Sequence, residues 1–144
     1  MAKYQVNITI IYFQICSDGT SQTLRLHEAP IKSIDISYDN KLILSGADDN
    51  LLKVTSLVNP KAFFALNNHQ HKIISARFSP DSRLICSSSY DNTVKLFDVN
   101  QKSIFHSFDS YTAPIYSVRF HPDGTCIATG GGDKDINVRT YTPI

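Results

Sequence analysis

The sequence predicts an all-β protein built from repeated units, each a small antiparallel sheet of four short strands. Three observations support this fold class: two sets of residues recur at one constant spacing, short segments alternate with turn-forming residues, and no segment shows a sustained helical period. At 144 residues the chain is long enough to bury a core. Its composition, 42% hydrophobic and 19% charged, is typical of a globular protein.

Three segments of the chain align without a gap: IDISYDNKLILSGADDNLLKV, ARFSPDSRLICSSSYDNTVKL and VRFHPDGTCIATGGGDKDINV. An apolar residue before the first turn and an aspartate in the second turn both recur every 42 residues. The apolar residues are Ile36, Phe78 and Phe120, and the aspartates are Asp49, Asp91 and Asp133. Because two independent markers keep one spacing, the chain contains internal repeats.

The middle repeat shows the expected elements most clearly. Its strands are predicted at residues 73–79, 83–89, 93–99 and 102–108, separated by turns such as SPDS and YDN. In the second strand, Leu84 and Cys86 alternate with Ile85, so both faces of the strand are apolar. This pattern predicts a sheet that is buried from both sides by neighbouring sheets.

The spacing divides the chain into 1–26, 27–68, 69–110 and 111–144. We interpret the first segment, with its apolar run ITIIYFQI, as the second half of a repeat, and the last as a repeat without its fourth strand. Such an arc would leave sheet edges and apolar faces uncovered. We therefore expect the remaining repeats to come from a longer chain, another copy or a neighbouring protein.

The charge and the cysteine content of the chain argue against some kinds of partner, cofactor and location. Fourteen basic and thirteen acidic residues leave a net charge of +1, which does not favour a nucleic-acid partner. The apolar N-terminal stretch is too short and too polar to span a membrane. Cys16, Cys86 and Cys126 lack metal-ligand spacing, so we expect free thiols in a reducing compartment such as the cytosol, and no cofactor.

The repeats resemble those of the WD-repeat family. The resemblance is carried by His69 with FSPD at 78–81 and SSSYDNTVKLFD at 87–98, and by FHPDG at 120–124 and GGGDKDINV at 130–138. It implies a partial β-propeller in which each repeat forms one four-stranded antiparallel blade. The sequence departs from the family in lacking tryptophan: Thr55, Phe97 and Arg139 stand in its place.

Two stretches, FSPDSRLICSSSYDNTVKLFD and FHPDGTCIATGG, look like those of the WD-repeat proteins of centrioles and basal bodies. That resemblance implies a non-catalytic structural scaffold of centriole or basal-body microtubule assemblies, within the cytoplasm and cytoskeleton. Tubulin or centriole wall proteins would then be its partners. The alternative is a general WD-repeat adaptor in a ubiquitin-ligase, transcription or RNA-processing complex.

Ser87, His69 and Asp91 have the residue types of a hydrolase triad. However, the same three types recur one repeat earlier, at His27, Ser45 and Asp49, and an enzyme rarely duplicates its nucleophile on successive repeats. The family resemblance instead implies a structural hydrogen-bond network, because a buried carboxylate needs partners. We therefore expect no enzymatic activity.

In the third repeat the network would contain Thr129 and Asp133, with Tyr111 in the position of the histidine. Since a phenol lacks the second nitrogen of an imidazole, this network should be the weakest of the three. The glycines at 130–132 lack a following Lys-Ser/Thr and helix, so they predict a strand end and a turn, not a phosphate loop. His69 and His71 have no nearby carboxylate or cysteine cluster that would favour a metal site.

The resemblance also implies that partners bind where the innermost strands begin. This places a candidate partner-binding rim at Lys32, Lys72, Ile74 and Tyr116. A mixture of lysine, aliphatic and aromatic side chains suits a protein interface. The alternative is that these residues line the mouth of the central channel without contacting a partner.

Overall fold

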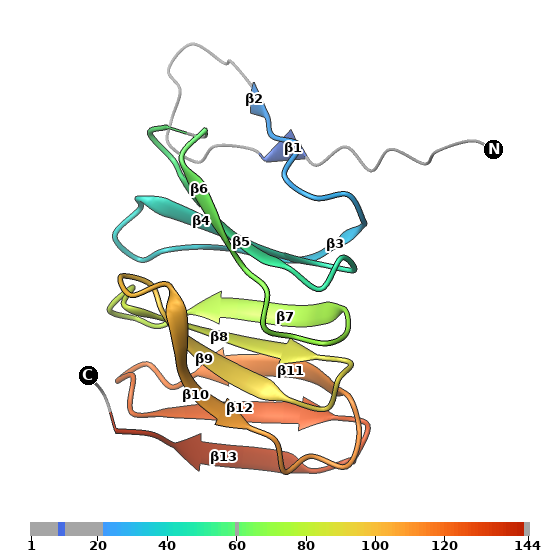
Figure 1. The fold of residues 1–144 in the computed structure, drawn as a ribbon. Helices are drawn as coiled ribbons and strands as arrows, with labels where there is room; N and C mark the ends of the chain where they lie inside the picture. Colours follow the sequence, from blue (N-terminus) through green and yellow to red (C-terminus); the bar gives the residue numbers. More distant parts are fainter. Residues whose placement is uncertain (1–8, 11–21, 60, 143–144) are drawn as a thin grey trace, which may run out of the picture.

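The computed structural model describes residues 9–10, 22–59 and 61–142, and this part of the chain is all-β (Figure 1). Blade 1 contains β3 (Ile31–Ile36), β4 (Leu42–Ala47), β5 (Leu52–Ser56) and β6 (Phe63–Leu66). Blade 2 contains β7 (Ile73–Phe78), β8 (Leu84–Ser89), β9 (Val94–Asp98) and β10 (Ser103–Phe108). Blade 3 contains β11 (Ile115–Phe120), β12 (Cys126–Gly131) and β13 (Ile136–Thr140).

Each blade is an antiparallel meander, with its strands hydrogen-bonded in chain order. The four strands predicted for the middle repeat are confirmed in β7 to β10. Of the half-repeat predicted for residues 1–26, the structure describes β1 (Thr9–Ile10), which pairs with β2 (Gln22–Thr23) in a two-stranded sheet, and residues 22–26. The rest of that prediction lies outside the described residues. No helix that could span a membrane occurs in the described ranges.

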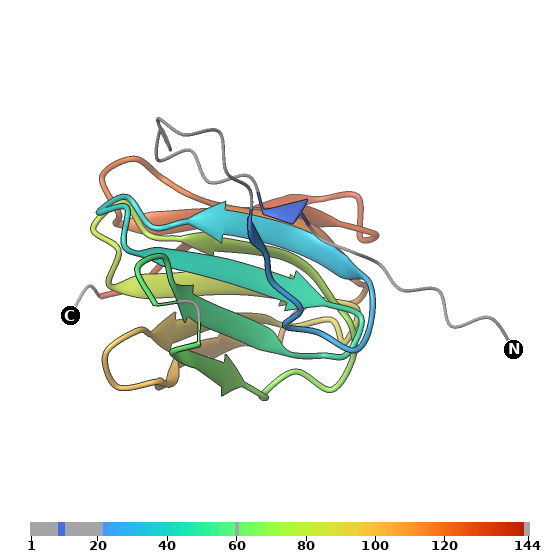
Figure 2. The same ribbon diagram turned by 90° about the horizontal axis from the view of Figure 1, so that it is seen from above.

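The blades stack face to face, with blade 2 in the middle (Figure 1). Viewed from above, the sheets overlie one another (Figure 2). The innermost strand of blade 2, β7, contacts the innermost strands of both neighbours, β3 and β11. This is the arrangement of a partial β-propeller, as the sequence predicts.

Two apolar clusters fill the spaces between blades. Between blades 1 and 2 the buried side chains are Leu44, Leu52, Val54, Leu66, Ile73, Ala76, Phe78, Ile85, Phe97 and Val99. Between blades 2 and 3 they are Cys86, Val94, Leu96, Tyr111, Ile115, Val118 and Ile127. Every residue of β8 is buried, because its side chains alternate between these two clusters. Each large apolar side chain buried in this way stabilises the fold by about 1.5–3 kcal/mol.

Hydrogen bonds between the innermost strands set the register of blade 1 on blade 2. The Ala76 N–H donates to Ser33 Oγ over 2.9 Å. The Phe78 N–H donates to Asp35 Oδ2 over 2.8 Å. Each bond joins a strand-edge amide of blade 2 to a side chain of blade 1, so the two blades cannot slide past each other without breaking both bonds.

The turns keep the 42-residue spacing in their backbone conformation. Positive φ angles occur at Asn40, Ser82 and Gly124 in the first turn of the three blades, and at Asn50, Asn92 and Lys134 in the second. Each innermost strand also carries a β-bulge at its first residues. Four of these six positions hold asparagine or glycine, which tolerate the left-handed region well, and Ser82 and Lys134 adopt the same conformation in the equivalent turns.

Candidate functional site

In blade 1 the predicted network residues lie together. His27 precedes β3, Ser45 lies in β4, and Asp49 lies in the turn between β4 and β5. His27 Nδ1 is 2.8 Å from Asp49 Oδ2, and His27 Nε2 is 2.7 Å from Ser45 Oγ. The imidazole therefore links the segment that leads into β3 to both β4 and the turn that follows β4.

Blade 2 repeats this geometry with additional bonds. His69 Nδ1 is 2.9 Å from Asp91 Oδ2, and His69 Nε2 is 2.6 Å from Ser87 Oγ. The Gln70 N–H also donates to Asp91 Oδ2 over 2.9 Å, and the Thr93 hydroxyl donates to Asp91 Oδ1 over 2.7 Å. The sequence prediction missed Thr93, although a threonine two residues after a turn aspartate is a recognisable signal.

Burial and hydrogen bonding shift the pKa values of His27 in blade 1 and of Asp91 in blade 2. Burial lowers the pKa of His27, an effect that the hydrogen bond to Asp49 only partly offsets. A neutral ring can donate its Nδ1–H to Asp49 and accept the Ser45 hydroxyl at Nε2. For Asp91, burial raises the pKa, but bonds from His69, Thr93 and the Gln70 amide outweigh it and hold the pKa well below its usual range.

Blade 3 has a reduced version of the network. The Tyr111 hydroxyl is 3.0 Å from Thr129 Oγ1, and the Arg139 guanidinium lies 5.5 Å from the centre of the Tyr111 ring. Asp133 accepts only the Asp135 N–H, over 3.3 Å, among the hydrogen bonds of the described residues. The structure therefore brings Tyr111 and Thr129 together but leaves Asp133 apart from them.

The predicted rim residues lie at the beginning of the innermost strands. Lys32, Ile74 and Tyr116 are the bulge positions of the three blades. The structure leaves Lys32 and Tyr116 exposed and Ile74 half-buried. Lys32 Nζ lies 3.5 Å from Asp48 Oδ2, which makes an ion pair at the tip of blade 1.

The tip of blade 2 carries a stacked cluster that the sequence prediction did not assemble. Lys72 Nζ lies 4.6 Å from the centre of the Tyr90 ring, and the rings of His71 and Tyr90 are 5.3 Å apart. The Tyr90 N–H donates to the Lys72 carbonyl, which holds the turn against the start of β7. Tyr90 remains exposed, so the cluster presents an aromatic face and a cation to solvent.

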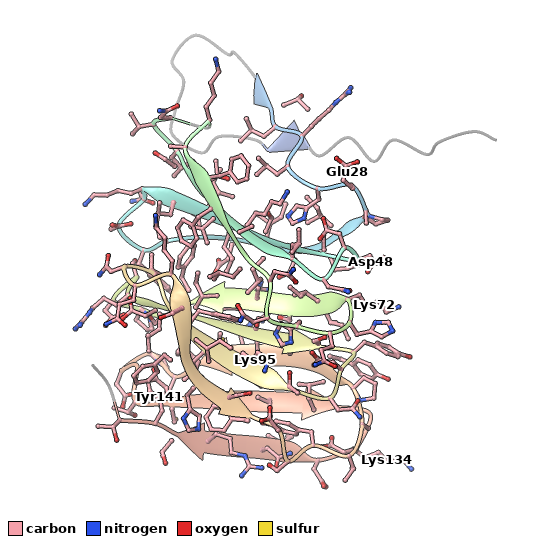
Figure 3. All side chains as sticks on the ribbon, in the orientation of Figure 1. Glu28, Asp48, Lys72, Lys95, Lys134 and Tyr141 are labelled. Atoms are coloured by element: carbon pink, nitrogen blue, oxygen red, sulfur yellow. The ribbon has the colours of Figure 1, made fainter. Side chains whose placement is uncertain are left out.

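Figure 3 shows Asp48, Lys72 and Lys134 along one edge of the stack, with Glu28 at the same edge and Tyr141 at the opposite one. We use the name inner-strand rim for the surface formed at this edge by Lys32, Asp48, His71, Lys72, Ile74, Tyr90 and Tyr116. Its members come from all three blades, so the surface exists only when the blades are stacked.

A comparison with protein-family models found the WD domain, G-beta repeat, three times, at residues 16–56, 61–98 and 102–139. The chain belongs to the WD40 family. A search of curated proteins found no match. Each of the second and third WD40 matches starts just before the outermost strand of one blade and runs through the three inner strands of the next, as in 61–98, which contains β6 to β9.

WD40 repeats generally provide protein-interaction scaffolds without catalysis, and the geometry of the triad-like set agrees with a structural role. Ser87 is fully buried, and its hydroxyl bonds with His69 Nε2 in the interior of the stack. The same arrangement around Ser45 makes a second copy of the set in blade 1. Among the described residues, no group of three or more His, Cys, Asp or Glu side chains is placed to hold a metal.

We predict that Asp91→Ala destabilises the protein more than Asp133→Ala. Removing the Asp91 carboxylate leaves His69, Thr93 and the Gln70 amide without their acceptor, at an expected cost of roughly 1–3 kcal/mol. Asp133→Ala removes one weak bond and should cost less than about 1 kcal/mol. Denaturant unfolding of both variants checks this ranking, and equal losses would contradict it.

Proposed function

We propose that this chain is a protein-interaction scaffold that binds its partners through the inner-strand rim. The observation that carries the proposal is the exposed cluster of Tyr90, Lys72 and His71 on blade 2, together with the exposed Tyr116 at the start of β11 on blade 3. Membership of the WD40 family supports the general role, since such repeats mediate protein–protein interactions. The inner-strand rim is the surface that we propose for such interactions.

The chemistry of the rim suits a protein partner. Tyrosine offers a large contact area with little conformational freedom to lose, and it can still donate a hydrogen bond. Lys72, held over Tyr90, is available to a carboxylate or a carbonyl oxygen of a partner. These side chains stand on bulges and tight turns of a stacked β-scaffold, so binding requires little reordering of the backbone.

The double variant Tyr90→Ser/Tyr116→Ser should lose specific partners. Removing both aromatic anchors should weaken a partner that needs them by about tenfold or more, the cost typical of interface hot spots. Quantitative affinity purification from cells, followed by mass spectrometry, measures this loss against the unmodified protein.

Tyr38→Ser is the matched control. Tyr38 is also an exposed tyrosine, but it lies in the turn between β3 and β4, at the opposite end of the blade from the Asp49 turn. Partners of the rim should be retained by this variant. If the double variant keeps every partner, or if Tyr38→Ser loses the same ones, the rim is not the binding surface.

The more specific form of the proposal is a structural role in centriole or basal-body microtubule assemblies, with tubulin or centriole wall proteins as partners. Its support is the likeness of FHPDGTCIATGG, at residues 120–131, to centriolar WD-repeat proteins. This stretch covers the last residue of β11, the turn after it and the whole of β12. An adaptor role in ubiquitin ligation, transcription or RNA processing is the competing form.

Imaging distinguishes the two forms. A tagged protein, viewed in dividing cells together with a centriole marker, should lie on the walls of centrioles or basal bodies. The Tyr90→Ser/Tyr116→Ser variant, imaged in parallel, shows whether that position depends on the rim. Diffuse or nuclear signal from the unmodified protein would contradict the centriolar form and favour an adaptor.

A further inference from the structure

The outer edge of β13 carries backbone groups that no described strand pairs with. In blades 1 and 2 the third strands, β5 and β9, each lie between two neighbouring strands of their own sheet. In blade 3, β13 is the last strand of the sheet among the described residues, and it lies at the end of the stack opposite blade 1 (Figure 1). An unpaired strand edge of this kind is a template for a further strand.

The equivalent strand of blade 1 shows which backbone groups of β13 point outward. The Ser56 N–H donates to the residue before β6, whereas the N–H of the next residue, Leu57, donates to the residue before β4. Ser56 corresponds to Thr140, two repeats later. Because backbone groups point to alternate sides along an antiparallel strand, those of Ile136, Val138 and Thr140 point away from β12.

The side chains of β13 alternate between two environments. Arg139 pairs with Ile127, which is buried between blades 2 and 3, so Arg139 and Asn137 lie on the side of the sheet that faces blade 2. Ile136 and Val138 lie on the other side, where they are 85% and 64% exposed. A strand added at this edge would therefore meet one polar and one apolar side.

The sequence of this strand, DINVRT, is complementary to itself. Two copies of the strand, antiparallel and centred on Asn137, bring Ile136 of each copy opposite Val138 of the other. These are the residues whose backbone groups point outward, so they form the hydrogen-bonded pairs of the new ladder. The same register brings Asp135 of each copy opposite Arg139 of the other. Facing β-branched residues and facing opposite charges both stabilise a pair of strands.

Other symmetric registers lack this match. The outward backbone groups oppose each other only when the pairing is centred on a residue of the strand, so the nearest alternatives are centred on Val138 or Ile136. The first leaves Asp135 opposite Tyr141, and no opposite charges face each other. The second sets the end of the strand against the turn between β12 and β13, where the ladder cannot continue.

Asp135 and Arg139 each have unused hydrogen-bonding capacity. The Asp135 carboxylate accepts no hydrogen bond and has no ion-pair partner within the described part of the chain. Arg139 Nη2 donates to Ser110 Oγ over 2.9 Å, but Arg139 Nε is buried without a hydrogen-bond partner among the described residues. A guanidinium has donors for both a hydroxyl and a carboxylate. Charge complementarity therefore favours a second copy of this chain as the occupant of the edge.

We propose that two copies of this chain associate through the outer edges of their β13 strands, antiparallel and centred on Asn137. The contact joins the blade 3 sheets of the two copies into one continuous sheet. It is isologous, so it closes at two copies. The two Asn137 side chains face each other at its centre, where each amide can both donate and accept a hydrogen bond. The proposal does not depend on the inner-strand rim.

Two charge reversals and their mixture test the contact. Asp135→Arg brings two arginines together, and Arg139→Asp brings two aspartates together. Each variant alone should therefore dimerise at least about tenfold more weakly than the unmodified chain, as measured by sedimentation at up to about 100 µM. The mixture should recover dimers, because every facing pair then has opposite charges. Recovery would also show that both variants are folded.

Glu28→Arg is the matched control. It makes the same change in charge as Asp135→Arg, at an exposed residue that precedes β3 in blade 1. This variant should dimerise like the unmodified chain. A chain that stays monomeric at about 100 µM would overturn the proposal. So would charge reversals that leave dimerisation unchanged, or a mixture in which dimers do not recover.

Cross-linking through Asn137→Cys tests the register. Facing residues of a pair that is not hydrogen-bonded have Cα atoms about 4.5 Å apart, within the range of a disulfide. Oxidation of this variant should give a covalent dimer on a non-reducing gel. Thr140→Cys is its control, because Thr140 would lie opposite Lys134 and the two added thiols would be about 20 Å apart. The native cysteines are common to both variants. Absence of the Asn137→Cys dimer, or equal cross-linking of the two variants, would contradict the proposed pairing.

Discussion

A four-stranded blade has two apolar faces and cannot bury either of them alone, and the rest of this structure depends on that constraint. Each blade is stable because its neighbour covers it, so the chain repeats one register of contacts. Burial of the apolar side chains contributes the larger part of the stabilisation, whereas the hydrogen bonds of Ser33 and Asp35 fix the register of blade 1 on blade 2. Blade 2, covered on both faces, shows the result most clearly: every residue of β8 is buried.

The histidine networks have a different role from the apolar clusters. His27 and His69 lie where the chain crosses from one blade to the innermost strand of the next, and each ties that crossing to a turn of the new blade. The turns that they hold stand at the same end of the blades as the inner-strand rim. The network and the proposed binding surface are therefore adjacent: Asp91 in the network directly follows Tyr90 in the rim. Blade 3, without the histidine, keeps the fold through Tyr111, which is itself part of the apolar cluster.

The sequence alone predicts the fold class, the strands of the middle repeat and the histidine, serine and aspartate of both full networks, because each of these recurs at a fixed spacing. It does not predict contacts that occur in one blade only. The stack of Lys72, His71 and Tyr90 exists because a tyrosine happens to occupy a turn position that is Asp48 in blade 1 and Gly132 in blade 3. The separation of Asp133 from Tyr111 depends on the reach of a phenol, which no spacing reveals. The sequence predicts that an apolar face of the last repeat is uncovered. Only the strand pairing shows that Ile136 and Val138 lie on the same face of the sheet.

Amide hydrogen exchange tests most directly the central claim that neighbouring blades stabilise one another. The amides of β8 should exchange slowest and those of β13 much faster, since β13 is an edge strand whose Ile136 and Val138 side chains are exposed. Equal protection of β8 and β13 would contradict the account, because it would mean that stability does not follow the covering of one blade by the next.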